Sequence, residues 1–312
     1  MNSKALLLTD KSDVLLDWLE FRTLTDPDKN GAVDELRSQL RITGSEDALE
    51  VDHDEASAIE DWEDPIEAAV TSAFLESEFR SRACGQQNYP FTVETNNLSR
   101  DDTWADNVYS FLLILSRLGP YAAKLEETGA KLFEELCSHA ARSYLGWPQD
   151  HVDSYVFGFP RRLAPSSFVE AVDDLCRNRM REGCADRKFP NARTKKDASL
   201  DVVAWRGFPD RESSKVIVFG QCATGNDWWE KRNDLQPQSW CGKWLLKHPA
   251  VPPLKAFFVP HRVPSERWPE LTFDAGVVFD RCRVSHLANP SLPEPLREQL
   301  KAWTAKAIAE VQ

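Results

Sequence analysis

Two polar residues border apolar segments at positions where a carboxylate and an amide could act together. Asp201 lies in the segment LDVVAW, and Gln221 directly follows the segment KVIVFG. Both segments are rich in β-branched and aromatic residues and are separated by GFPDRESS, which predicts two strands joined by a hairpin turn. A turn centred near Arg211 places Asp201 opposite Gln221. Because side chains alternate along a strand, Ala223 is expected on the same face.

An Asp and a Gln among apolar residues are costly to bury unless they share a ligand. Carboxylate and amide oxygens, together with a backbone carbonyl and water, suit Mg²⁺. The sequence therefore predicts a divalent-cation site at this end of the hairpin. Two simpler interpretations stay open, in which Asp201 is a turn residue and Gln221 caps the end of a strand.

The same hairpin resembles part of a known family. Residues 197–201 read DASLD, residues 221–223 read QCA, and residues 129–134 read GAKLFE. These runs resemble the D-G-G-[ILV]-D, Q-C-K and G-x-x-F-E motifs of the Mrr-like branch of the PD-(D/E)XK restriction-endonuclease-like superfamily. The resemblance covers roughly residues 126–285. It implies a restriction-endonuclease-like α/β (α+β) domain with a mixed sheet flanked by helices. The resemblance does not extend to the first 125 residues, whose composition and periodicity predict an acidic, mainly helical N-terminal region.

The resemblance also implies roles for individual residues. Asp201 is the main ligand of a Mg²⁺ or Mn²⁺ ion, and Gln221 and the backbone carbonyl of Cys222 complete the protein ligands. Glu134 is a further ligand through water or a supporting group, although Glu135 is an equal choice without the motif. The implied reaction is hydrolysis of a DNA phosphodiester, in which the metal stabilises charge on the phosphate and lowers the pKa of the attacking water.

One motif residue is absent, because the family's lysine falls at Ala223. In this superfamily the lysine is sometimes supplied from elsewhere, often from the helix after the hairpin, where Lys231 is expected. Lys195 and Lys196 are weaker candidates. If no lysine reaches the site, the resemblance implies instead a catalytically inactive nuclease fold that binds DNA or serves as a scaffold subunit of a multi-protein complex.

Charge is divided unevenly along the chain. The net charge is −12, but residues 1–128 contain 11 Lys and Arg against 27 Asp and Glu, and the remainder carries a net charge of +4. Within that remainder, residues 177–196 contain eight basic and two acidic residues. Such a basic run could follow a phosphate backbone, and a solvated surface is the alternative. The residues expected at nucleic acid are Arg161, Arg162, Arg193, Lys195 and Lys196.

The acidic residues 1–125 are predicted to form a partner-binding or regulatory unit, and residues 126–312 the nuclease-like domain. An acidic face could occupy the basic groove in a resting state. Four tryptophans after the hairpin could stack on bases, but their helical spacing favours packing in a core or at a protein partner; they are Trp228, Trp229, Trp240 and Trp244. By analogy with Mrr-like proteins, such a nuclease would act in prokaryotic defence against foreign DNA.

Hydrophobic periodicity predicts the elements that must position these residues. Residues 86–102 have turn chemistry and predict a linker or a long loop. Helices are expected at residues 13–19 and just beyond, 30–40, 65–82, 104–118, 126–145, 166–181, 226–231 and 237–247 and from residue 293, and strands at residues 200–205, 215–220, 254–260 and 275–280.

Seven cysteines, an odd number without a CxxC pair, argue against a disulfide framework or a zinc finger and favour a reducing cytoplasm. No run approaches the roughly 20 apolar residues that span a bilayer. The N-terminal apolar segment is also too short for a signal peptide. We therefore expect a cytoplasmic protein without a membrane partner.

Overall fold

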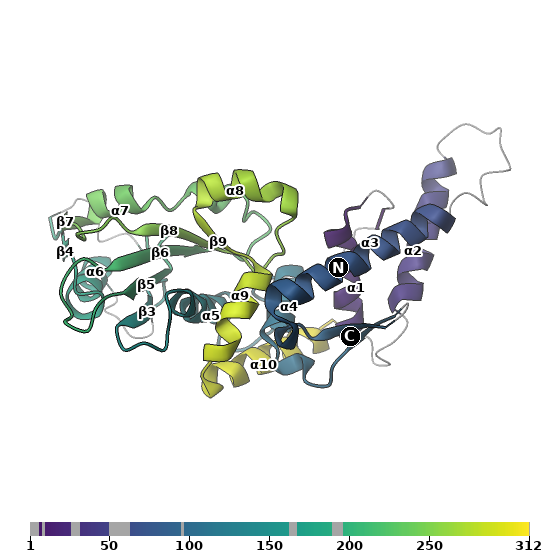
Figure 1. Ribbon diagram of the computed structural model, residues 1–312, viewed down its shortest axis with the longest axis horizontal. Coiled ribbons are helices and arrows are strands. Elements are labelled where there is room, and N and C mark those ends of the chain that lie inside the picture. Colours follow the sequence, from purple (N-terminus) through teal and green to yellow (C-terminus); the bar gives the residue numbers. More distant parts are fainter. Residues whose placement is uncertain are drawn as a thin grey trace.

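A five-stranded mixed sheet lies at the centre of the computed structural model, which describes residues 6–7, 10–25, 32–49, 63–94, 97–161, 167–188 and 196–311 (Figure 1). The strand order is β3-β5-β6-β8-β9. The first three strands are antiparallel, and β6, β8 and β9 are parallel. Their bounds are β3 (Val152–Val156), β5 (Val202–Arg206), β6 (Val216–Cys222), β8 (Leu254–Phe258) and β9 (Val277–Phe279).

The hairpin of β5 and β6 has the predicted register. Val202 pairs with Gly220 and Arg206 pairs with Val216, so the paired positions are symmetric about residue 211. Alternate residues of β5 are buried on opposite faces of the sheet, because Val202 packs in one hydrophobic cluster and Val203 in another. The expected α/β class and the central mixed sheet are confirmed.

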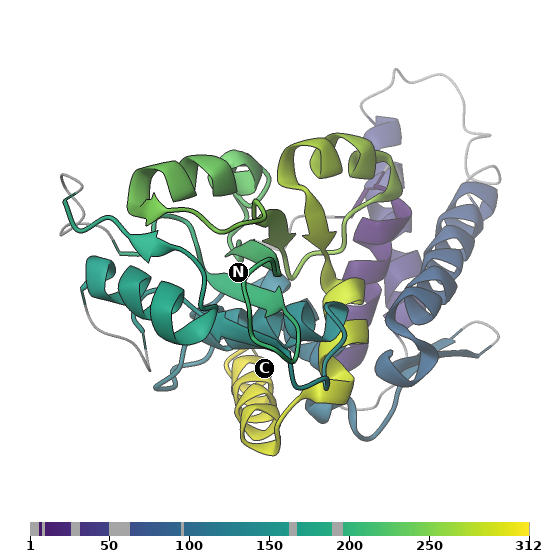
Figure 2. The same cartoon turned by 60° about the vertical axis from the view of Figure 1, so that its left-hand side comes forward.

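Helices cover both faces of this sheet (Figures 1 and 2). One face packs against α5 (Gly129–Tyr144), beside which lies α9 (Arg281–Ala288). The other face is covered by α6 (Phe168–Asp174), α7 (Pro237–Trp244) and α8 (Trp268–Ala275). The sheet that carries the candidate residues therefore lies between two layers of helices.

The apolar stripe of α5 explains its orientation. Leu132, Phe133, Leu136 and Cys137 recur at helical spacing and are buried against the sheet. Thr128 caps the helix by accepting the backbone N–H of Lys131 at 3.4 Å. The helix consequently begins with a fixed geometry, and its first turns lie at the ends of β5 and β6 that carry the candidate site.

The N-terminal region packs onto the sheet domain through one continuous set of buried side chains. This set runs from Leu15 and Phe111 to Val202 and Phe258 of the sheet. Away from the sheet, α2 and α3 extend outward together (Figure 1). The division at residues 125 and 126 stays a prediction. The helices of this region and of the C-terminus are α1 (Ser12–Thr25), α2 (Ala32–Leu49), α3 (Glu63–Cys84), α4 (Val108–Leu118) and α10 (Glu294–Ala309).

Buried charges join the N-terminal helices to α9. Arg80 and Glu20 are fully buried and lie 2.9 Å apart from Nη1 to Oε2. Asp17 Oδ1 accepts from Arg80 Nη1 at 2.6 Å and from Arg281 Nη1 at 2.7 Å. Tyr109 donates its hydroxyl proton to Glu20 at 2.9 Å. Because every one of these charges has a partner, the network fixes how the two parts of the chain meet.

Several elements were not expected. Residues 86–102 contain a hairpin of β1 (Phe91–Glu94) and β2 (Asn97–Arg100), so their prediction as a linker or loop was wrong. Strand β3 was missed, because a five-residue strand with exposed polar positions carries little periodicity. The eight-residue helices α8 and α9 were also missed, because about two helical turns define a periodic pattern only weakly. The remaining short elements are β4 (Cys184–Ala185), β7 (Leu245–Lys247), η2 (Gln86–Asn88), η3 (Trp104–Asp106), η4 (Leu175–Arg179), η6 (Glu230–Asn233), η7 (Ser265–Arg267) and η8 (Asn289–Ser291).

Among the described helices, none combines the length and the apolar content needed to cross a membrane.

We predict that Arg281→Met lowers the free energy of unfolding by about 3–5 kcal/mol, because it leaves the buried carboxylate of Asp17 with one cation fewer. Urea denaturation followed by circular dichroism measures the change. As a control, Glu67→Gln removes a half-exposed partner of Arg37 and should cost less than about 1 kcal/mol. Equal effects of the two substitutions would show that the buried network contributes no more than a surface pair.

Candidate functional site

Two carboxylates meet where α5 passes the start of β5. Glu134 projects from α5 against the backbone of Gly158, where an added Cβ would come within 2.4 Å of Glu134 Oε2. A larger residue at position 158 would therefore displace this carboxylate from its place. Asp201 precedes β5, and its Oδ2 accepts the backbone N–H of Cys222 at 2.8 Å.

The backbone at Asp201 departs from a regular ladder. Its N–H donates to the carbonyl of Gly220 at 2.9 Å, although Val202 is the register partner of Gly220. Two residues thus oppose one, as in a β-bulge, which re-aims the side chain of the extra residue. This irregularity explains why the carboxylate of Asp201 lies among charged groups of α5 rather than following the alternation of the strand.

A tight turn precedes Asp201. Ala198 and Ser199 have φ values of 56° and 64°, and the N–H of Leu200 donates to the carbonyl of Asp197 at 3.3 Å. Two central residues with positive φ define a type I′ turn, for which glycine or asparagine is preferred. The Asp197 carboxylate stabilises the turn by accepting the N–H of Ser199 at 3.1 Å.

Burial and repulsion act together on the two carboxylates. Burial, reinforced by the charge of Glu134, raises the pKa of Asp201 to about 8. Burial also raises the pKa of Glu134 to about 7, and Asp197 and Glu135 add to the rise. The ammonium of Lys131 opposes both shifts, and the N–H of Cys222 opposes the shift at Asp201. The site is therefore short of positive charge.

Lys131 is the functional candidate that the sequence analysis missed. Its Nζ lies 2.7 Å from Glu134 Oε2, and both side chains are largely shielded, with 15% and 12% of their surface exposed. Its charge also acts on Asp201. The signal was available in the sequence, since Lys131 stands three residues before Glu134 on the same helical face.

The structure places the expected lysine differently. Lys231 lies in η6 and forms an ion pair with Asp227, its Nζ 3.1 Å from Oδ1. The charges acting most strongly on Asp201 are those of Glu134, Asp197 and Lys131. Ala223, at the motif position, is buried in a hydrophobic cluster with Trp228. Lys231 as the catalytic lysine stays a prediction.

The two residues of β6 that were expected to bind the metal are Gln221 and Cys222. Gln221 lies apart from the carboxylates, and Cys222 contacts Asp201 through a different group from the one expected. Gln221 is buried, and its Oε1 accepts the N–H of Leu235 at 3.2 Å on the face opposite α5. The structure thus does not bring the Gln221 amide together with Asp201. Cys222 contacts Asp201 through its N–H, not its carbonyl.

The carboxylates of Asp201 and Glu134 could supply part of the ligands of a divalent cation. Mg²⁺ is often held by one or two carboxylates, with water and phosphate oxygens as its other ligands. Asp201 and Glu134 could supply this pair, and their mutual repulsion is the force that a cation would relieve. Across the described part of the chain, no group of three or more His, Cys, Asp or Glu side chains is placed to hold a metal ion. A cation here would thus depend on water and substrate oxygens.

Arg161 and Lys196 flank the turn that carries Asp197. Arg161 donates through Nη2 to the carbonyl of Lys196 and lies 4.7 Å from the centre of the Phe157 ring. Its Nε and Nη1 are buried and find no acceptor among the residues described. Donors of this kind could bind phosphate oxygens. The other expected basic residues, Arg162, Arg193 and Lys195, lie outside the described residues.

The tryptophans after the hairpin belong to the hydrophobic interior. Trp240 and Trp244 pack with Phe168 under α7, and Trp228 stacks on His261. The packing interpretation of the sequence is confirmed for these three rings. The edges of Trp240 and Trp244 also line a pocket, which is described below.

Comparison of the chain with models of known protein families, with curated proteins and with solved structures found no match.

The raised pKa values predict how stability varies with pH. The ordinary values of 3.8 for Asp201 and 4.5 for Glu134 apply to the unfolded chain, and the folded values are about 8 and about 7. Folding thus takes up protons, and the free energy of unfolding should fall as pH rises from about 4 to about 8. Mg²⁺ at pH 8 should restore part of this loss, because it offsets the repulsion.

Melting temperatures between pH 4 and pH 8, with and without Mg²⁺, measure both effects. The double variant Asp201→Asn, Glu134→Gln should melt higher than the wild type at pH 8 and show no response to Mg²⁺. Asp153→Asn, which changes an exposed carboxylate of β3, should behave as the wild type. A Mg²⁺ response that survives in the double variant would place the cation elsewhere.

Proposed function

We propose that the protein is a metal-dependent nuclease that hydrolyses phosphodiester bonds of DNA, with Asp201, Glu134 and Lys131 at its active site. The observation that carries this proposal is the meeting of two carboxylates of raised pKa with one shielded ammonium. Burial of acids next to a specific charge partner is characteristic of functional sites.

The order of elements supports a restriction-endonuclease-like domain. Helix α5 carries Glu134 and precedes the hairpin of β5 and β6, which is followed by α7 and the parallel strands β8 and β9. This is the order of helix, hairpin, helix and further strands that the motifs imply. Asp201 and Glu134, two of the motif acids, lie at one site in this arrangement.

The residues would divide the work as follows. Asp201 and Glu134 would hold a Mg²⁺ or Mn²⁺ ion, which when bound would supply charge stabilisation at the phosphate and lower the pKa of bound water. Lys131 keeps Glu134 in place and offers its remaining N–H donors to a phosphate oxygen. Arg161 would bind an adjoining backbone phosphate through Nε and Nη1, which have no acceptor among the described residues, and Lys196 would do so through its ammonium.

A second candidate function is that of an inactive nuclease fold that binds DNA or a protein partner. It is favoured by the burial of Ala223, which leaves no lysine at the motif position, and by the position of Gln221 away from the carboxylates. A role in defence against foreign DNA, in a cytoplasmic setting, belongs to either candidate and is supported by the motif resemblance alone.

We predict that purified protein cleaves DNA in Mg²⁺ or Mn²⁺ and not in EDTA. Asp201→Ala and Lys131→Ala should each reduce cleavage at least about 100-fold, because the first removes a proposed ligand of the metal ion and the second removes positive charge that would stabilise the reacting phosphate. Lys231→Ala tests the other candidate lysine and should cleave as the wild type if Lys131 has the catalytic role. Linear, nicked and supercoiled DNA should be assayed in parallel, and circular dichroism should show that each variant is folded.

The outcomes separate the candidates. Loss of cleavage in Lys231→Ala with retention in Lys131→Ala would transfer the catalytic role to Lys231. Metal-independent cleavage, or cleavage that persists in Asp201→Ala, would overturn the proposed site. DNA binding without cleavage in all forms would favour the inactive fold.

A further inference from the structure

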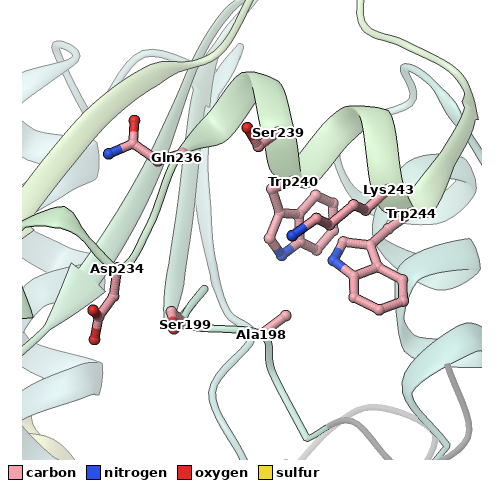
Figure 3. Close-up of a pocket in the computed structure, with 8 residues that line it drawn as sticks. All are labelled: Ala198, Ser199, Asp234, Gln236, Ser239, Trp240, Lys243 and Trp244. Atoms are coloured by element: carbon pink, nitrogen blue, oxygen red, sulfur yellow. The ribbon is translucent and has the colours of Figure 1, made fainter. Parts of the chain in front are cut away.

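A pocket of about 360 Å³ lies on the face of the sheet opposite α5, beside the turn that carries Asp201 (Figure 3). Helix α7 forms one wall, and residues 198–199 lie across from it. In Figure 3 the side chains of Trp240, Lys243 and Trp244 extend from α7 toward this turn. The lining residues are Ala198, Ser199, Asp234, Gln236, Ser239, Trp240, Lys243 and Trp244.

The pocket combines four kinds of chemistry. Trp240 and Trp244, each less than a tenth exposed, contribute aromatic ring atoms, Lys243 a cation, Asp234 a carboxylate acceptor and Ser199 a hydroxyl. A nucleotide matches these groups, because its base contacts aromatic rings, the edge of the base carries donors and acceptors, and its sugar carries a phosphate. The volume is near the lower end of the roughly 300–1,000 Å³ of ligand pockets, which favours a ligand of this size.

Trp240 provides an independent indication of a ligand. Its side chain is 4% exposed, and its Nε1 has no acceptor among the residues that the structure describes. A buried N–H without a partner is destabilising, and phenylalanine would fill a similar space without that cost. The ring is held edge-to-face by Phe157 and Phe219, with centroids 6.0 and 5.3 Å away. An acceptor on a bound base would satisfy this donor.

The pocket and the carboxylates share one turn. Ala198 and Ser199 line the pocket, Asp197 closes the turn through its bond to Ser199, and Asp201 follows one residue after Leu200. Two consecutive non-glycine residues with positive φ are strained, and such strain concentrates at functional sites. A ligand in the pocket would therefore lie against the segment that positions Asp201.

We propose that this pocket binds one unstacked nucleobase, whose strand continues past the turn toward Asp201. The proposal deepens the proposed nuclease function by naming how the strand is held, and it rests on that function for the choice of DNA. A free nucleotide presents the same base, so the test must distinguish the two sources.

Fluorescence anisotropy in EDTA, where no cleavage is expected, measures binding alone. The probes are labelled single-stranded DNA oligonucleotides, either intact or abasic throughout, so that both carry the same phosphates. Wild type should bind the intact strand about tenfold more tightly, since the bound base adds contacts to the phosphate contacts that both probes share. Trp240→Phe keeps a ring but removes the N–H, and it should weaken intact binding about fivefold while abasic binding is unchanged.

Matched controls come from the same helix and the strand that follows it. Gln238→Ala, on α7 outside the pocket lining, should bind both probes as the wild type. Lys243→Ala should weaken intact binding, whereas Lys247→Ala, an exposed lysine of β7, should not. Displacement of the intact strand by deoxynucleoside monophosphates would support a pocket that also accepts a free nucleotide, and failure of displacement would support a base within a strand.

Equal binding of intact and abasic strands by the wild type would overturn the base pocket. Equal weakening of both probes by Trp240→Phe would also overturn it, because the effect would then concern phosphates or folding. Neither result depends on cleavage. Base-dependent binding with no cleavage in Mg²⁺ would leave the pocket in place and remove the nuclease proposal instead.

Discussion

The arrangement of this protein depends on a buried network of charges between its N-terminal helices and α9. Arg80 and Arg281 are fully buried, and Asp17 and Glu20 lie between them. Removing such ions from water costs several kcal/mol each, and only their mutual attraction and hydrogen bonds offset that cost. The network is satisfied only when α1, α3, α4 and α9 are assembled, so it ties the fold of the first hundred residues to that of the sheet.

This network also shows that some of the acidic residues in the N-terminal region have a structural role. Asp17 and Glu20 act on arginines of the interior, and Glu76 bonds both Arg80 and Arg262. These acids therefore serve packing between the two parts of the chain. A surface role for the N-terminal region, whether toward a partner or toward the basic residues near Arg161, depends on its other acidic residues.

In the candidate site, unlike in the buried network, negative charges are not fully offset by positive ones. Asp201 and Glu134 repel one another, and Lys131 is the cation that offsets them most directly. The raised pKa values of the two acids reflect this shortage of positive charge. Either a bound cation or a bound proton would offset it. A type I′ turn with two strained residues holds Asp201 at this position, and the same turn borders the pocket under α7. Catalytic metal binding and base binding would thus be coupled through one short segment.

The sequence by itself determined the elements with strong periodicity and the pairing of β5 with β6. Apolar segments around a single turn leave one register that buries both strands, so residue 211 could be identified as its centre. The motifs also pointed to Asp201 and Glu134 as candidate residues, and the structure places Asp201 just before β5 and Glu134 within α5.

Only the tertiary structure decided which side chains meet. Alternation predicted Asp201 and Gln221 on one face, but the extra residue beside Gly220 directs Asp201 toward α5, and Gln221 bonds Leu235 on the other face. Lys131 reaches the acids because the packing of α5 fixes its first turn there, which no local pattern states. Tertiary packing determines which charged residues of distant elements become partners. The sequence of a single segment therefore does not specify the pair.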